Sequence, residues 1–245
     1  MAAKLGAKVS MIGMLGDDVY GKSTLENFAT VGVDASCVGT TKDCSSGVAT
    51  IVVDASAHNC IVIVPGANDH MTLAKANAHA DVIRGARVLL TQLEVSLDAT
   101  IEAMRIAKRS PSSTTVFFNP APASRSLPNE IYALCDVVLP NETEAEILTG
   151  ISVVDVASAE RAARALQQLG AKAVIVTLGS NGCVVVDADG GSATHVPGRV
   201  VKAVDSTGAG DSFVGTLAWC VAQVTHRTVD DSSRSFDINV SIVTC

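Results

Sequence analysis

The sequence lacks an excess of positive charge, a long hydrophobic run and an export signal. Its formal net charge is −7, which argues against a nucleic-acid partner. Its apolar runs are short and interrupted by charges, so no membrane span is predicted. The N-terminus has neither a secretory hydrophobic region nor a cleavage site. We therefore expect a cytoplasmic protein that binds neither nucleic acid nor membrane.

Metal-ligand motifs are missing as well. The seven cysteines never form a C-x-x-C pair, and the five histidines do not cluster with them, so a zinc site is not predicted. We expect reduced thiols, most of them buried. What is present is a high share of hydrophobic residues, 48% of 245 positions, which suits one α/β domain with a sizeable core.

Short apolar runs alternate with amphipathic segments along the chain, without an internal repeat or an interdomain linker. This alternation predicts a mostly parallel central sheet covered by helices on both faces. Strands are predicted over residues 8–14, 87–92, 115–119, 137–139, 173–178 and 183–187, and helices over residues 21–30, 96–109, 143–148 and 157–169.

One pair of β-rich runs departs from the alternation. Residues 47–54 and 60–64 are joined by a polar turn with no helix between them. Two such runs predict an antiparallel hairpin, here within residues 46–65.

The most informative stretch is AVDSTGAGDSF, residues 203–213, which precedes an apolar run over 214–224. It predicts a strand end, a turn and a helix. Gly208 and Gly210 let the backbone approach a ligand, and the free N–H groups of the helix start favour phosphate. The carboxylate of Asp211 would repel phosphate but can take a proton from an attacking hydroxyl, which favours a kinase. The alternative is an ordinary helix cap.

A second phosphate-binding motif competes with this one. Residues 16–23, GDDVYGKS, match the G-x-x-x-x-G-K-[ST] loop between a predicted strand and a predicted helix. However, Asp17 and Asp18 place two carboxylates where backbone N–H groups should surround phosphate. We therefore interpret this turn as structural, with Lys22 on a solvated helix face.

Several motifs together resemble one enzyme family. The DSTGAGD segment at 205–211 is similar to the C-terminal signature of the carbohydrate kinases related to ribokinase. Six further blocks follow the order of that family: GDD at 16–18, SGVA at 46–49, QLE at 92–94, NPAPA at 119–123, NETEAE at 141–146 and TLGSNG at 177–182. The resemblance implies a three-layer α/β/α fold whose small β-hairpin forms a lid over the sugar.

The resemblance also implies the reaction. ATP would transfer its γ-phosphate to a primary hydroxyl of D-ribose, giving ribose 5-phosphate, with Mg²⁺ bound to ATP and K⁺ or another monovalent cation as activator. Asp211 would be the catalytic base, and Gly208, Ala209 and Gly210 would form the anion hole. Fructose, 2-keto-3-deoxygluconate and nucleosides are alternative substrates.

Other blocks are given nucleotide and metal roles by the resemblance. Asn141 would serve the nucleotide phosphates and Glu144 would hold Mg²⁺ through water, although a helix cap at Asn141 is the alternative. Asp205 and the carbonyl of Thr207 would hold the monovalent cation. The remaining nucleotide contacts would come from a strand-connecting turn and the helix start, namely Thr177, Leu178, Gly179, Ser180, Asn181, Gly182, Gly210 and Asp211.

The sugar would be held at the ends of two strands. Glu94 follows an apolar strand, at the rim where α/β folds bind ligands, and the resemblance makes it, with Asp211, a sugar ligand. The alternative for Glu94 is an acid at a helix start. Asn119, which heads a proline-rich turn, is interpreted as scaffold.

Compared with the family, the sequence is expected to be incomplete at both ends. The first strand, with its sugar-binding turn, would lie outside it and would leave a gap in the central sheet. Met1 and Cys245 would each fall within a helix. A noncatalytic truncated relative is therefore an alternative to an active kinase, and a homodimer through the lid is a further expectation.

Overall fold

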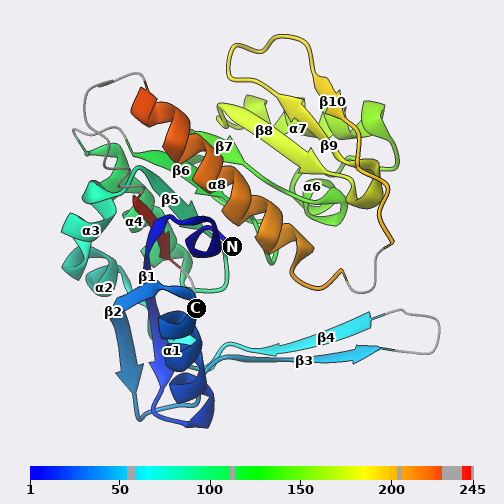
Figure 1. Cartoon of the computed structure of the whole chain (residues 1–245). Helices are drawn as coiled ribbons and strands as arrows, with labels where there is room; N and C mark the ends of the chain where they lie inside the picture. The colour runs from blue at the N-terminus through cyan, green and yellow to red at the C-terminus, as the bar shows by residue number, and fades with distance from the viewer. Residues whose placement is uncertain (54–58, 111–113, 203–205, 228–238, 244–245) are drawn as a thin grey trace.

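The structure, shown in Figure 1, is a computed structural model that describes residues 1–53, 59–110, 114–202, 206–227 and 239–243. Its central sheet has nine strands in the order β10-β9-β8-β7-β6-β5-β11-β1-β2, and a separate sheet pairs β3 with β4. The pairs from β2 across to β8 are parallel, whereas β9 is antiparallel to both β8 and β10. The mostly parallel sheet is therefore confirmed.

The strands follow the predicted apolar runs closely. They are β1 (Lys8–Gly16), β2 (Val33–Thr41), β3 (Val48–Val53), β4 (Asn59–Val64), β5 (Val88–Thr91), β6 (Thr115–Phe118), β7 (Val137–Val138), β8 (Ala173–Thr177), β9 (Cys183–Val186), β10 (Thr194–Val196) and β11 (Asn239–Val243). Among these, β2, β10 and β11 were not predicted.

The four predicted helices are present, together with shorter ones that the periodicity does not reveal. The α-helices are α1 (Val19–Val31), α2 (Leu73–Ala78), α3 (Ala80–Gly85), α4 (Leu97–Lys108), α5 (Asn129–Leu134), α6 (Glu142–Thr149), α7 (Val156–Gln168) and α8 (Ala209–Arg227). Three short 3₁₀ helices are η1 (Ala3–Leu5), η2 (Gly66–His70) and η3 (Gly179–Asn181).

Alternating side chains of the central strands enter two separate hydrophobic cores. Leu89 of β5 and Phe118 of β6 pack into the core with helices α2 to α7, whereas Val88 and Phe117 pack into the core with α8 and the N-terminal segment. This is the two-residue period of a strand buried on both faces. The three-layer α/β/α arrangement is thus confirmed.

The expectation of a gap in the central sheet is wrong. Strand β11 lies between β1 and β5 and is parallel to both, with Asn239 to Val243 in register with Lys8 to Ile12 and Val240 to Val243 in register with Val88 to Thr91. The chain just before Cys245 is therefore a strand and not the expected helix. Cys245 itself lies outside the described residues. Parallel neighbours on both sides supply hydrogen-bond partners that a helix here would leave unused.

Strands β3 and β4 form the predicted hairpin, which projects away from the central sheet (Figure 1). Val62, Ile63 and Val64 are each about half exposed. Successive side chains of a strand point to opposite faces, so neither face of this part of β4 is covered by the described residues.

The base of the hairpin is fastened to the turn after β1. The Asp18 carboxylate accepts hydrogen bonds from Gly21 N–H at 2.8 Å and from Ser46 N–H and Oγ, both at 2.7 Å. Ser46 Oγ also accepts from Gly16 N–H at 3.0 Å. The bond from Gly21 is the main reason that the pKa of Asp18 lies below its ordinary value of 3.8. The N–H groups of Gly16 and Gly21 therefore donate to side chains of the protein, so they are not available to a phosphate.

These contacts predict different outcomes for two neighbouring variants. Lys22→Ala should leave the KM for ATP within about twofold, since this exposed side chain reaches only Asp17, 3.9 Å away. Asp18→Asn should lower Tm by a few degrees at pH 7 without changing that KM. Because the pKa of Asp18 is lowered in the folded state, the stabilisation is lost as the pH falls through it, so the Tm difference should shrink below about pH 4. A large rise in KM for Lys22→Ala would support a phosphate loop here.

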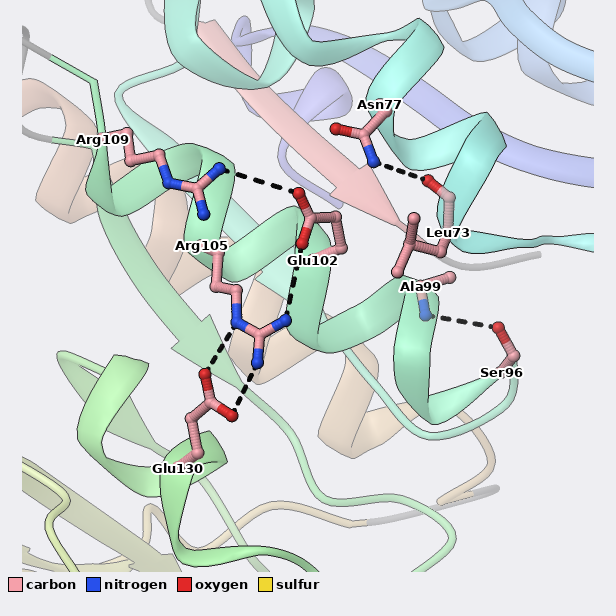
Figure 2. A network of polar contacts seen from close by, with 8 residues as sticks. All are labelled: Leu73, Asn77, Ser96, Ala99, Glu102, Arg105, Arg109 and Glu130. Atoms are coloured by element: carbon pink, nitrogen blue, oxygen red, sulfur yellow. Dashed lines mark hydrogen bonds and ion pairs between the residues drawn. The ribbon is translucent and has the colours of Figure 1, made fainter.

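Helix α4 fixes the loop that follows β5. Ser96 Oγ accepts from Ala99 N–H at 3.3 Å and donates to the Met71 carbonyl at 2.7 Å, so it both caps α4 and ties it to η2. Figure 2 shows this cap and, further along α4, Arg105 between Glu102 and Glu130 of α5. Arg105 donates two hydrogen bonds of 2.7 Å to Glu130. The loop that carries Gln92 and Glu94 is therefore followed directly by a helix whose start is anchored to η2.

The sequence also predicts reduced cysteines and no membrane-spanning helix. Among the cysteines that the structure describes, all are free, with Cys37, Cys135 and Cys183 buried, Cys44 half-buried and Cys220 exposed. Burial raises the pKa of the Cys135 and Cys183 thiols. In the described part of the chain, every helix is too short or too polar to cross a bilayer.

Candidate active site

Helix α8 begins immediately after the glycine turn, as predicted. Gly208 has φ +71°, a left-handed conformation that favours glycine. The first helical hydrogen bond runs from Ser212 N–H to the Gly208 carbonyl, at 2.9 Å. The N–H groups of Gly210 and Asp211 precede that bond and have no helical partner. Ala209 N–H donates to the Ser206 carbonyl at 3.1 Å, so Gly210 is the more available member of the predicted anion hole.

Asp211, in the first turn of α8, lines a cavity of about 260 Å³ together with Glu94. The two residues that the sequence predicts for the sugar therefore come together, from positions 117 apart in the chain. Both are exposed side chains. The full lining is Met1, Ala2, Met11, Leu90, Gln92, Glu94, Asn119, Asp211, Val214 and Gly215.

The polar lining of this cavity is rich in hydrogen-bond acceptors. Among the residues that the structure describes, its polar side chains are two carboxylates, Glu94 and Asp211, and two amides, Gln92 and Asn119. Gln92 and Asn119 follow β5 and β6, so both stand at the carboxyl edge of the parallel sheet. A lining rich in acceptor side chains suits a ligand that offers several hydroxyl donors.

Sequence reasoning assigned no role to Gln92 and treated Asn119 as scaffold. Their common signal is position, one residue after the end of a central parallel strand. Asn119 N–H donates to the Thr91 carbonyl at 2.9 Å, which continues the β5–β6 ladder to the edge of the cavity. The apolar wall comes from α8 and the N-terminus, where a Cβ added to Gly215 would lie 3.2 Å from Met1 Cβ.

Asn141 and Glu144 form the capping box of α6, the alternative that the sequence left open. Asn141 Oδ1 accepts from Glu144 N–H at 2.8 Å, and Glu144 Oε2 accepts from Asn141 N–H at 2.9 Å. Desolvation, and then the negative charge of Asp211, raise the pKa of Glu144, against the hydrogen bond from Asn141. The charge of Asp211 therefore acts on Glu144, although burial is the larger cause of the raised pKa.

The predicted nucleotide loop directly adjoins α6. Asn141 forms a parallel β-bridge with Thr177, and residues 177–182 turn between the antiparallel strands β8 and β9. Leu178 N–H donates to the Gly182 carbonyl at 2.8 Å, and Gly182 has φ +89°. A Cβ on Gly182 would collide with the carbonyl of Val196, so this position requires glycine.

Residues 195–198, which sequence reasoning missed, brace the outer side of this loop. His195 Nε2 lies 2.8 Å from the Asn181 carbonyl oxygen. A second cavity, of about 440 Å³, lies here, and its lining includes Ser180, Asn181, His195, Pro197 and Glu142. Glu142 is the first residue of α6, so this cavity lies between the start of that helix and the β8–β9 turn.

The predicted metal ligands are placed only in part. Asp205 lies outside the described residues, and Thr207 is exposed in the turn before α8. Within the described residues, no three His, Cys, Asp or Glu side chains converge as a metal cage would require. The monovalent cation site therefore stays a prediction.

Sequence comparison identifies close relatives of the whole arrangement. A family model described as pfkB family carbohydrate kinase matches residues 1–234. A ribokinase from Mus musculus is 40% identical over 230 residues, covering 94% of this chain and 71% of that protein. A deoxyribokinase from Salmonella typhi is 38% identical over 217 residues, covering 89% and 70%.

Structural comparison gives the same family. A ribokinase of Arabidopsis thaliana, solved with ribose and ATP, superposes with a TM-score of 0.81 at 28% identity, covering 91% of this chain and 71% of that one. The ribokinase of Giardia lamblia also gives 0.81, at 26% identity and with 92% and 72% covered. With its fold, its Asp211 helix and these relatives, the chain belongs to the pfkB family of carbohydrate kinases.

Proposed function

We propose that this protein is an ATP-dependent sugar kinase that phosphorylates the primary hydroxyl of D-ribose to give ribose 5-phosphate. The observation that carries this proposal is the shared cavity of Asp211 and Glu94, whose acceptor-rich lining suits a polyol. The 40% identity to a ribokinase over nearly the whole chain supports the choice of sugar.

Asp211 is the residue placed to accept the proton. As the sugar oxygen forms its bond to the γ-phosphorus, the hydroxyl proton passes to the Asp211 carboxylate, and the bond between the γ-phosphorus and the bridging oxygen breaks to leave ADP. The unpartnered N–H of Gly210, at the positive end of α8, stabilises negative charge on the transferring group. Gly208 gives the turn its left-handed conformation. The N–H of Ala209 is already bonded to the Ser206 carbonyl, so Ala209 would line the anion hole without donating to the phosphate.

ATP would lie along the α6 cap and the β8–β9 turn. The exposed amide of Asn141 can contact phosphate oxygens, and Thr177 is adjacent to it through the β-bridge. The turn residues Leu178, Gly179, Ser180, Asn181 and Gly182 would contact the rest of the nucleotide, with Gly179 at φ +53° leaving its backbone accessible.

The residues around Glu144 fit a Mg²⁺ ion that arrives with ATP. Glu144 shares negative potential with Asp211, which a cation relieves, and one of its oxygens stays outside the capping bond. A hydrated Mg²⁺ held through water by Glu144 would neutralise phosphate charge. A ribokinase II of E. coli, solved with ATP and Mg²⁺, shares the fold at 23% identity. Asp205 and the Thr207 carbonyl remain our proposed ligands for a monovalent cation.

The β3–β4 hairpin would close over the sugar and pair with a second copy of the chain. Val62, Ile63 and Val64 expose apolar surface on both faces of β4. If one face of the hairpin covered the sugar and the other packed against the hairpin of a second copy, both apolar faces would be buried. Closure excludes water, which otherwise competes as phosphoryl acceptor. We also propose a cytoplasmic location, because ATP and free sugar are both available there.

The second candidate is a kinase for 2-deoxyribose, because a deoxyribokinase is nearly as similar as the ribokinase. The decisive assay measures ADP release by the purified chain with D-ribose, 2-deoxyribose, fructose and adenosine. D-ribose should give the highest kcat/KM. Preference for another sugar would overturn the choice of substrate, and no sugar-stimulated ADP release would indicate a noncatalytic relative.

Glu94→Ala is the variant that tests the sugar side. It removes a charged acceptor from the cavity, and a charge-assisted hydrogen bond lost in this way should raise the KM for ribose about ten- to a hundredfold. The KM for ATP should change by less than about threefold, since Glu94 lines the cavity that the α6 cap and the β8–β9 turn do not reach. An effect on ATP with ribose unchanged would move Glu94 to the nucleotide side.

A further inference from the structure

Gln92 contributes a buried oxygen that has no partner in the unliganded protein. Among the described side chains, Gln92 Oε1 is one of two buried polar atoms without a hydrogen bond, the other being Asn68 Oδ1. Of these two residues, only Gln92 lines the cavity with Glu94 and Asp211. A buried acceptor without a donor is destabilising, because its water has been removed and nothing has replaced it.

The backbone on both sides of Gln92 is held by hydrogen bonds, which fixes the point where its side chain starts. Thr100 Oγ1 donates to the Gln92 carbonyl at 3.2 Å, and Thr91 Oγ1 donates to the Phe117 carbonyl at 3.1 Å. The capped start of α4 follows directly, fastened through Ser96 to Met71. These bonds place the Cα of Gln92 at the cavity wall, on the rigid elements that a ligand site requires.

The chemistry of the lining decides what the unpaired oxygen accepts. Among the described lining residues, Glu94 and Asp211 are acceptors when ionised, and no described residue donates to Gln92 Oε1, so a bound ligand can supply the donor. A sugar hydroxyl offers an O–H donor without adding charge, and it can also accept from the amide nitrogen of the same residue.

We propose that Gln92 is a substrate-positioning residue whose Oε1 accepts a hydrogen bond from a hydroxyl of the bound sugar. This inference rests on the proposed sugar-kinase function. It adds a residue that recognises the acceptor, beside Glu94 and apart from the proton acceptor Asp211. The unliganded protein keeps the amide unsatisfied, and the sugar satisfies it on binding, so the residue lowers the stability of the empty site and strengthens sugar binding.

Gln92→Met tests the proposal, because methionine has a similar length and no hydrogen-bonding amide. Its KM for the sugar should rise about tenfold, from loss of one buried hydrogen bond, with the KM for ATP within about twofold. Tm without ligand should be equal to or above that of the wild type, since an unsatisfied oxygen is gone, and the rise in Tm caused by saturating sugar should be smaller. Gln92→Asn, which keeps the amide on a side chain one methylene shorter, should raise the KM for the sugar less than Gln92→Met does.

Two outcomes would overturn the assignment. A Gln92→Met protein with unchanged sugar KM would make Gln92 structural, and one whose KM for ATP rises as much as its KM for the sugar would make the effect a general one on the fold. The wild-type substrate panel separates this result from the proposed function. If the wild type prefers fructose or 2-deoxyribose, D-ribose is wrong as the substrate, while the Gln92 comparison is made with the preferred sugar and still decides the inference.

Discussion

Replacing Asp211 by asparagine should lower kcat by about a hundred- to ten-thousandfold, the usual contribution of a general base. The amide keeps the shape of the side chain and its place in the first turn of α8, but it cannot take the proton of the sugar hydroxyl. Binding of ATP should change little, because the nucleotide contacts proposed at Asn141 and residues 177–182 are intact. The measurement is steady-state ADP release, with ATP affinity determined separately by calorimetry.

Asp98→Asn is a matched control. Asp98 is an exposed acid in the first turn of α4, where its interaction with the helix dipole resembles that of Asp211, yet it does not line the cavity. The control should keep kcat within about twofold. If Asp211→Asn also kept near-normal turnover, proton transfer by Asp211 would be excluded, and the acid at this helix start would be an ordinary first-turn residue.

Ending the chain after residue 238 should abolish cooperative folding. This truncation removes β11, which has five residues in register with β1 and four with β5, in the middle of the nine-stranded sheet. Each lost backbone hydrogen bond contributes about 1 kcal/mol net, and two strand edges are uncovered at once. Against a total stability of roughly 5–15 kcal/mol, that loss is comparable with the whole. Soluble yield and thermal melting by circular dichroism measure it.

Two further samples make this test specific to the strand. Ser241→Pro removes a backbone N–H from the centre of β11 and should lower Tm strongly. A peptide of residues 239–245, present while the truncated chain refolds, should restore folding, whereas a scrambled peptide should not. A truncated chain with wild-type Tm would show that β11 contributes nothing to the sheet.

Local patterns in the sequence identified much of the fold. Two-residue alternation and short apolar runs identified β1, β5, β6 and β8, because a strand between two cores must be apolar on both faces. Turn glycines followed by an apolar run identified the start of α8 and placed Asp211 in its first turn. The hairpin followed from two β-rich runs without a helix between them.

Local patterns also named Glu94 and Asp211, but not what surrounds them. Gln92 and Asn119 join the same cavity because β5 and β6 are neighbours in the sheet, a relation that neither segment encodes by itself. For Asn141 and Glu144 the sequence allowed two interpretations, a helix capping box and a site for nucleotide phosphate and Mg²⁺. Only the folded chain shows the cap in place and the Asp211 charge beside it.

The sequence by itself determined the family-typical motifs, the parallel α/β character and the acid at the start of α8, since each depends on neighbouring residues and their period. Tertiary structure alone decided the position of β11. Its five residues, NVSIV, alternate polar and apolar side chains as a strand does, but nothing in this segment says that it pairs between β1 and β5, where the N–H and carbonyl groups of those strands receive it. Those groups are supplied by segments about 150 or more residues away in the chain, and pairing at that distance is a property of the whole fold.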